Sequence, residues 1–176
     1  MENKLLSKNF ILTVASATFL YTASFMLTTV CPRFVTDSGN TDSLAGIIAA
    51  LFTLSSFFTR PLWGWLTDKK GRKLVYTTGI VLGIGAILLL FFCNNNLFLM
   101  ASRILFGVGY SAFTTAGGTI VCDVVPEDKL QQGLAVYGVT NVLSQAVAPV
   151  VALWLYDKDF LWVIAIATAI CTAGLL

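Results

Sequence analysis

The chain contains no histidine, and lysine, arginine, aspartate and glutamate together make up only 11% of its 176 residues. A soluble domain has about a quarter charged residues, so this composition excludes a water-facing surface over most of the chain. The net charge of +2 is small, and the basic residues form no long polar segment. Binding to nucleic acid is therefore not expected.

The four cysteines are poor candidates for chemistry. Cys31, Cys93, Cys122 and Cys171 are widely spaced and form no CxxC pair. Because histidine is absent as well, zinc, haem and redox-pair sites lack their usual ligands. We expect no metal and no cofactor, and we interpret the cysteines as small apolar packing residues.

Hydrophobic residues, in contrast, make up 57% of the chain and fall into six runs of roughly membrane-spanning length. Each run is predicted to be helical, because a single span in lipid must satisfy its own backbone hydrogen bonds. The predicted fold class is all-α, a polytopic membrane protein with a bundle of six transmembrane helices. The predicted spans cover residues 10–30, 44–66, 74–93, 97–122, 130–156 and 160–176.

The first and last runs differ from ordinary spans. The first is too long for the core of a signal peptide and no small-x-small cleavage site follows it, so we interpret it as a retained helix. The last run, 160–176, would reach only about 25 Å, less than the ~30 Å of a hydrocarbon core. We therefore expect the chain to be cut inside or at the end of its sixth helix, and whether such a cut is natural stays open.

The segments between the runs carry helix breakers and charges. The breakers and polar residues are Pro32 and Gly39, then Gly71, then Asn94, Asn95 and Asn96, then Pro126, and finally Asp157, Lys158 and Asp159. One side of the membrane would carry seven basic residues: Lys4, Lys8, Lys69, Lys70, Arg72, Lys73 and Lys129. The other side would have only Arg33 and Lys158. This asymmetry predicts a cytoplasmic amino terminus in a cell membrane, either plasma or inner.

A short internal similarity links two of the span ends. Residues 65–69, WLTDK, follow the second span, and residues 154–158, WLYDK, follow the fifth. Inverted three-helix repeats would place corresponding segments three helices apart, on opposite sides of the membrane. The similarity suggests two three-helix units, although five residues can match by chance.

The most specific motif is the second loop, residues 64–73, GWLTDKKGRK. A loop that only sets topology would explain its lysines and arginine, but not two glycines and an aspartate at fixed spacing. We expect Gly64 to let another helix approach closely and Gly71 to form a tight turn. Asp68 and Arg72 are near enough in sequence to pair at a helix end.

This loop matches in full the pattern G-x-x-x-D-[RK]-x-G-[RK]-[RK], and the chain thereby resembles the amino-terminal half of transporters of the major facilitator superfamily. The fourth span adds Arg103, Gly107 and Gly109, which fit the R-x-x-x-G-x-G pattern of the same superfamily. A buried arginine costs on the order of 2.5–3.5 kcal/mol on insertion scales and usually faces a bundle interior. The alternative is that Arg103 snorkels to the outer interface.

The resemblance implies a twelve-helix transporter whose first and fourth helices line a central cavity, while the second and fifth pack against the other half and the third is peripheral. At helical spacing Arg103, Gly107, Tyr110, Thr114 and Gly118 share one face of the fourth span. Hydroxyls of the first span and a row in the fifth, Tyr137, Asn141, Gln145 and Pro149, suggest a polar interior, although hydrogen bonds between helices explain each hydroxyl equally well.

Three sets of candidate site residues follow from the resemblance. The cavity-facing set is Arg103, Tyr110, Thr114, Tyr21, Ser24, Asn141 and Gln145. The gating set is Gly64, Asp68, Lys69, Gly71, Arg72, Lys73 and Asp123, with Asp123 expected after the fourth span, in a charge cluster with Asp68 and Arg72. The packing set is Gly107, Gly109, Gly79, Gly83 and Pro149.

The function that this predicts is secondary transport of a small organic solute, with efflux slightly favoured over uptake. Ala148 and Pro149 lack the following glycine that is common in efflux members, and no span holds a central carboxylate, so proton coupling stays open. The expected partners are the solute, the lipid bilayer and a missing second six-helix half or second chain. The alternatives are a non-transporting remnant or partner subunit and a membrane-embedded enzyme, for which the spans offer no acid, histidine or nucleophile with a base.

Overall fold

The computed structural model describes residues 7–92 and 96–175, and every regular element in this part of the chain is helical. The all-α fold predicted from the sequence is therefore confirmed. Lys4, Cys93, Asn94, Asn95 and Leu176 lie outside the described residues. The elements are α1 Lys8–Asp37, α2 Asp42–Lys70, α3 Arg72–Leu89, η1 Leu90–Phe92, α4 Asn96–Val124, η2 Glu127–Lys129, α5 Leu130–Tyr156 and α6 Phe160–Ala173.

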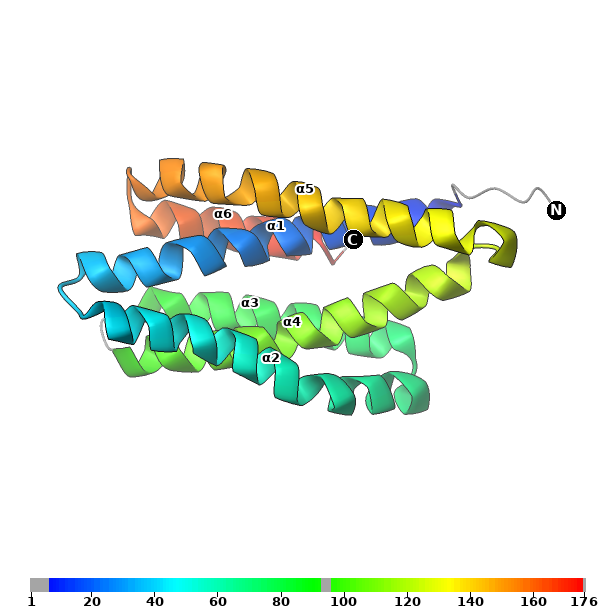
Figure 1. The fold of residues 1–176 in the computed structure, drawn as a ribbon, viewed down its shortest axis with the longest axis horizontal. Helices are drawn as coiled ribbons and strands as arrows, with labels where there is room; N and C mark the ends of the chain where they lie inside the picture. The colour runs from blue at the N-terminus through cyan, green and yellow to red at the C-terminus, as the bar shows by residue number, and fades with distance from the viewer. Residues whose placement is uncertain (1–6, 93–95, 176) are drawn as a thin grey trace.

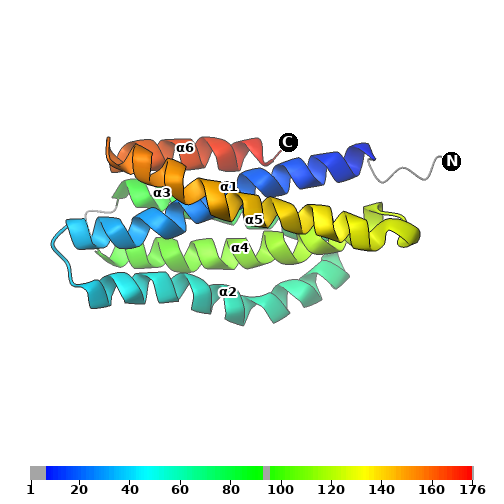
Figure 2. The same ribbon diagram turned by 45° about the horizontal axis from the view of Figure 1, so that its top comes forward.

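The helices form one elongated bundle in which chain direction alternates from each helix to the next (Figure 1). The connections α1–α2 and α5–α6 lie at one end of the bundle, while α2–α3 and α4–α5 lie at the opposite end. Within the described residues, five helices are long and apolar enough to cross a membrane. The sixth, α6, has 14 residues and ends partway along the bundle (Figure 2).

Several predicted span boundaries need correction. Pro32 does not separate the first two helices but lies inside α1, which continues to Asp37. The reversal comes later, where the backbone N–H of Ser38 donates to the carbonyl of Phe34 at 3.0 Å and Gly39 adopts a φ of +80°. A proline removes one helical hydrogen bond and bends a helix, but packing against neighbours can keep the helix intact.

The other helix ends differ less from the predicted ones. The sixth span was expected to reach residue 176, yet α6 ends at Ala173 with Gly174 as its C-cap. Asp159, expected in a gap, is the N-cap of α6, and its carboxylate accepts a hydrogen bond from the backbone N–H of Leu161 at 3.1 Å. Ser7 and Thr41 cap α1 and α2 in the same way, each cap contributing about 1 kcal/mol.

The two similar segments found in the sequence have the same local structure. At the end of α2, the Lys69 ammonium lies 4.4 Å from the centroid of the Trp65 ring. At the end of α5, the Lys158 ammonium lies 3.8 Å from the Trp154 ring. The two ends are at opposite ends of the bundle, as inverted repeats would have them. Exposed tryptophans beside lysines are typical of membrane–water interfaces.

At the end of the bundle where α1 meets the α5–α6 turn, charges and rings join the two segments. The Arg33 guanidinium lies 3.2 Å from the Asp157 carboxylate and 3.6 Å from that of Asp37. Tyr156 donates its hydroxyl to Asp37 at 2.8 Å. The α1 extension beyond Pro32 is thereby fastened to the α5–α6 hairpin.

Glycines allow α3 and α4 to pack with their backbones in contact. A methyl group added at Gly79 would lie 2.6 Å from the backbone nitrogen of Phe113, and one at Gly109 would lie 2.7 Å from the carbonyl oxygen of Gly79. Gly83 is less constrained, since its nearest atoms would be 3.8 Å away. Small residues at such crossings are the main source of helix association in lipid, where the hydrophobic effect is lost.

We predict that Gly109→Ala destabilises the bundle by roughly 1–3 kcal/mol, because the new methyl group forces two backbones apart. Gly118→Ala is the matched control in the same helix, since a methyl group there would meet no atom within 4 Å. That variant should be neutral or slightly more stable, because alanine favours helix more than glycine. The stability of both variants is measured by unfolding the purified chain in detergent micelles with increasing dodecyl sulfate, with circular dichroism as the readout. Equal stability of the two variants would contradict the close packing.

Candidate functional site

The motif at residues 64–73 is almost entirely helical, which corrects the expectation of a loop. Gly64 to Lys70 belong to α2, Arg72 and Lys73 begin α3, and Gly71 alone connects the two helices. Gly71 has φ +91° and ψ 148°, a conformation that side-chain-bearing residues rarely adopt. Its N–H donates to the carbonyl of Thr67 at 3.2 Å and closes α2.

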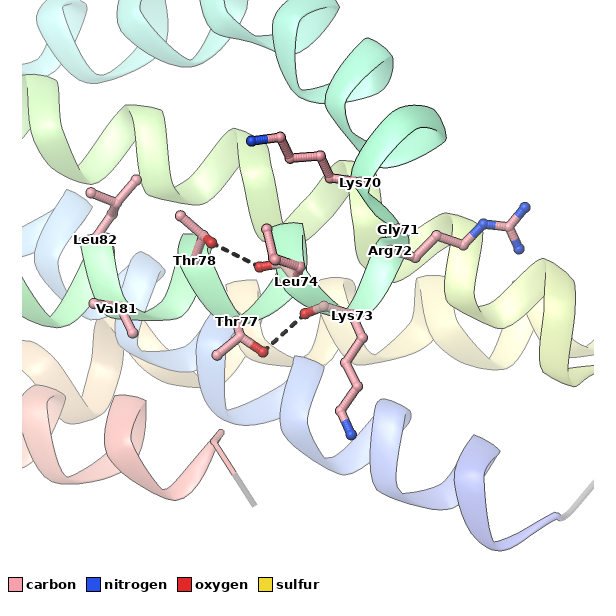
Figure 3. A pocket seen from close by; sticks show the side chains of 9 residues that line it. All are labelled: Lys70, Gly71, Arg72, Lys73, Leu74, Thr77, Thr78, Val81 and Leu82. Atoms are coloured by element: carbon pink, nitrogen blue, oxygen red, sulfur yellow. Dashed lines mark hydrogen bonds between the residues drawn. The ribbon is translucent and has the colours of Figure 1, made fainter.

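Arg72 forms an ion pair with Asp123 rather than with Asp68. This pair joins the first turn of α3 to the last turn of α4, which extends to Val124 and so includes Asp123. Asp68 is exposed on the last turn of α2 and forms no ion pair or hydrogen bond with the residues described here. The Gly71 turn directs Arg72 away from α2 (Figure 3), which explains why the sequence neighbours do not pair.

The other members of the predicted gating set take no part in the Arg72–Asp123 ion pair. Lys69 lies over Trp65, and Lys73 is exposed at the start of α3. A methyl group at Gly64 would meet no described atom within 4 Å, so no described helix of this bundle approaches closely there. Close approach occurs instead at Gly107, where an added methyl group would collide with Ser55 and the Phe52 carbonyl of α2.

An aromatic cluster joins α1, α4 and α5 in the interior. The ring centroid of Tyr21 lies 6.4 Å from Tyr110, 5.6 Å from Phe113 and 6.1 Å from Tyr137. Tyr21 also donates its hydroxyl to that of Tyr137 at 3.4 Å. The Asn141 side chain lies near the hydroxyls of Tyr21 and Tyr110. These contacts bring together side chains of α1, α4 and α5 that the sequence could not place side by side.

Arg60 of α2 is a member of this site that the sequence analysis missed. It is exposed, yet it is close enough to interact electrostatically with the hydroxyls of Tyr21 and Tyr110. The sequence feature that could have identified Arg60 is its position on an apolar helix, where a cation costs free energy unless it binds a partner or reaches water. Gln145 is also exposed, while Asn141 and Tyr110 are half-buried. The cluster therefore has an open polar edge.

Most hydroxyls of α1 bond within their own helix. Six hydroxyls of α1 each donate to the backbone carbonyl four residues earlier, at 2.7–2.9 Å; they belong to Thr13, Thr18, Thr22, Ser24, Thr28 and Thr29. Ser24 is 1% exposed, so it lies within the packed interior rather than on an open face. Thr114 likewise donates to the carbonyl of Tyr110 at 2.8 Å. The abundance of hydroxyls is thus explained locally and does not by itself mark a binding surface.

Arg103 lies inside the bundle. Its side chain is 2% exposed, and its guanidinium carbon lies 5.4 Å from the centroid of the Phe106 ring. Neither Nε nor Nη2 has a hydrogen-bond partner among the described residues. The sequence left two orientations open for the Arg103 side chain, toward the bundle interior or toward the outer membrane interface. In the structure the side chain points to the interior. At Gly118, the last residue of the predicted stripe, an added methyl group would meet no described atom within 4 Å.

The helices differ in how much of their surface the bundle covers. Of the five long helices, α2 and α5 have the smallest buried share. The exposed apolar side chains of α2 include Leu54, Phe57 and Phe58, and those of α5 include Val139, Val142 and Val147. α3 packs along α4. No cluster of metal-ligating side chains is present within residues 7–92 and 96–175.

Comparison with known proteins agrees with this arrangement. The chain is 27% identical over 139 residues to Protein spinster homolog 3 of Danio rerio, which covers 77% of this chain and 28% of that protein. It is 26% identical over 136 residues to the Multidrug transporter protein MdtP of Bacillus subtilis, which covers 77% of this chain and 25% of that protein. It is 31% identical over 97 residues to the Quinolone resistance protein NorA of Staphylococcus aureus. That alignment covers 55% of this chain and 25% of NorA.

The chain spans only about a quarter of the length of these relatives. A sequence model of the Major Facilitator Superfamily matches residues 13–176, which is nearly the whole chain. The family match and the apolar helices indicate a multi-pass membrane protein. On this match, and on the five apolar helices that support it, the chain belongs to the major facilitator superfamily.

Proposed function

We propose that this bundle is the amino-terminal half of a secondary transporter that moves a small organic solute by alternating access, with efflux favoured over uptake. The observation that carries the proposal is the ion pair between Arg72 and Asp123, beside an Asp68 that has no partner among residues 7–92 and 96–175. The pair fastens α3 to α4 at one end of the bundle, and Asp68 on α2 would then be available for a contact with a second bundle. Such an arrangement suits a half that moves as a rigid body against another.

The solute would bind at the open edge of the aromatic cluster. Tyr110 and Phe113 offer ring surfaces for an apolar or aromatic body, and Asn141 with Arg60 offers hydrogen bonds and a positive charge. A second six-helix bundle resting on α2 and α5 would enclose these groups. We therefore expect solute transport to require that second bundle, supplied by the same chain or by another. The names of MdtP and NorA, which refer to multidrug transport and quinolone resistance, support efflux of such a solute.

In this proposal the bundle lies in a plasma or inner membrane, with its amino terminus on the cytoplasmic side. The ends that would then face inward are the α2–α3 turn and the α4–α5 connection, which carry most of the basic residues. Proton coupling has no carboxylate within the described spans to act as a carrier. A proton carrier would then be Asp68 or Asp123 at the inner end, or a residue of the second half.

We predict that Asp68→Asn lowers the transport rate about tenfold or more in the transporter that contains this bundle, because its contact with the second half is worth roughly 1.4 kcal/mol or more in the closed state. The measurement is flux of a fluorescent aromatic anion in proteoliposomes, with the amount of inserted protein quantified. Glu127→Gln, an exposed acid at the same end of the bundle, should leave the flux unchanged. Normal flux in Asp68→Asn would remove the gating role.

A second prediction concerns Arg103. Replacing it by Met removes a buried cation whose Nε and Nη2 lack partners, so the bundle should become equally or more stable, by up to about 3 kcal/mol. Transport should nevertheless be lost, while Arg103→Lys should retain part of it. Unfolding in detergent and flux in proteoliposomes test the two effects separately. A variant that is both destabilised and active would contradict the assignment.

The orientation gives a third prediction. Glu127→Cys and Lys158→Cys place single thiols at exposed positions on opposite ends of the bundle, in a background where the four native cysteines are serine. A membrane-impermeant maleimide should label the thiol at position 158 in intact cells and the thiol at position 127 only in inside-out vesicles. The reverse pattern would show that the amino terminus faces outward.

A further inference from the structure

Two arginines are the only charged residues in the described part of the chain that lie more than five residues from a helix end. Arg60 lies ten residues before the end of α2, and Arg103 lies seven residues after the start of α4. Every aspartate and glutamate among residues 7–92 and 96–175 lies within three residues of a helix end or in a connection. The interior of the described spans therefore carries positive charge with no negative charge beside it.

Neither arginine forms an ion pair with a residue that the structure describes. Arg103 is 2% exposed, and its Nε and Nη2 lack hydrogen-bond partners there. Arg60 is exposed and lies close enough to the hydroxyls of Tyr21 and Tyr110 to interact electrostatically with them. In surroundings of low dielectric constant, charges of one sign add up and act over longer distances than in water. An organic cation at the aromatic cluster would be repelled by both arginines, whereas an anion would be attracted by both.

A row of aromatic rings connects the buried arginine to the open edge of the cluster. The guanidinium carbon of Arg103 lies 5.4 Å from the centroid of the Phe106 ring. The Phe106 ring lies 5.9 Å from that of Phe52, which in turn lies 5.2 Å from that of Tyr110. Phe52 and Tyr110 are half-buried, so part of each ring remains available to a ligand at the edge where Arg60 lies.

The two arginines lie at different depths in the membrane. The hydroxyls of Thr59 and Ser111 are 2.7 Å apart, so Arg60, the next residue of α2, lies at about the level of Ser111. Eight residues of α4 separate Ser111 from Arg103, which corresponds to about 12 Å along the helix. A ligand whose charged group is at Arg60 thus has room to extend its body along the rings toward Arg103.

We propose that the open edge of the aromatic cluster binds organic anions with an aromatic or apolar body, and that the transported solute is such an anion. Arg60 would hold the negative group, and the body would lie against Phe52 and Tyr110. Asn141, which lies near the tyrosine hydroxyls, would donate a hydrogen bond. Arg103 is too deeply buried to touch a ligand at this edge and would act through its charge alone. The inference about the solute rests on the proposed transport function.

The alternative use for Arg60 is an ion pair with an acid of the second bundle. Such a pair would neutralise the edge in the whole transporter, which would then not favour anions. Two measurements are therefore needed, binding to this chain by itself and transport by the transporter that contains it.

The binding test compares two radiolabelled probes that have the same ring system and opposite charges, naphthalenesulfonate and naphthylmethylammonium. Equilibrium dialysis against the chain in nanodiscs of phosphatidylcholine, with empty nanodiscs as the blank, gives both affinities. The sulfonate should bind about tenfold more tightly, which lies between the Coulomb attraction of one charge pair in bulk water and that near a protein surface. Equal affinities, tighter binding of the ammonium probe, or no binding of either would overturn the proposal.

Variants at Arg60 assign this preference to one residue. Arg60→Gln should remove most of the preference, and Arg60→Lys should keep most of it. Arg60→Glu should reverse it in favour of the ammonium probe, a gain that loss of folding cannot produce. Lys158→Gln is the matched control, because it removes one positive charge at the outer end of the bundle, where the ammonium lies over the Trp154 ring. An equal loss of preference in Lys158→Gln would overturn the assignment to Arg60.

The transport test uses the same two probes in proteoliposomes that hold the complete transporter. Flux of the sulfonate with little flux of the ammonium probe is the expected result. Equal or faster flux of the ammonium probe would overturn the anionic solute and leave the proposed transport function standing. If neither probe is moved while the chain still prefers the sulfonate, the transport function is contradicted and the anion-binding edge is retained.

Discussion

The bundle depends on close contacts that α4 makes with several neighbouring helices through glycines. Gly109 lies against α3, Gly107 against α2, and Gly117 against Tyr137 of α5, where an added methyl group would lie 2.5 Å from the tyrosine hydroxyl. In lipid, helices gain nothing from hiding apolar surface from water, so close contact of this kind supplies most of the association energy. α4 is consequently the central helix of the bundle, and it carries Arg103 and part of the aromatic cluster.

Hydropathy was sufficient to predict the helices, their number and their alternating direction, because lipid leaves a spanning segment few conformations other than a helix. It could not predict where the helices end. Pro32 was assigned to a gap although α1 continues past it, since whether a proline breaks a helix is decided by the contacts around it, here the Arg33–Asp157 pair and the Phe34–Phe160 stack with ring centroids 4.1 Å apart.

For the candidate site, the sequence identified residue types but not partners. Asp68 and Arg72 are four residues apart, a spacing that allows pairing within one helix, but Gly71 interrupts the helix between them and Arg72 pairs with Asp123 instead. Arg60 could not be associated with Tyr21 and Tyr110 because they lie on three different helices. Local spacing predicts contacts within an element, whereas contacts between elements depend on crossing geometry that one sequence does not encode.

Arg103 shows why this bundle is best understood as part of a larger structure. A cation buried to 2% exposure with two nitrogens unpartnered is unfavourable, and no acid from the described spans compensates it. The Phe106 ring at 5.4 Å offers only a weak cation–π contact, of about 0.5–2 kcal/mol. We infer that its use lies in the proposed transporter, where an acceptor from a second bundle or from the solute would have to enter the bundle interior to reach it. The same reasoning applies to Asp68, which has no partner among the described residues while its neighbour Arg72 has one.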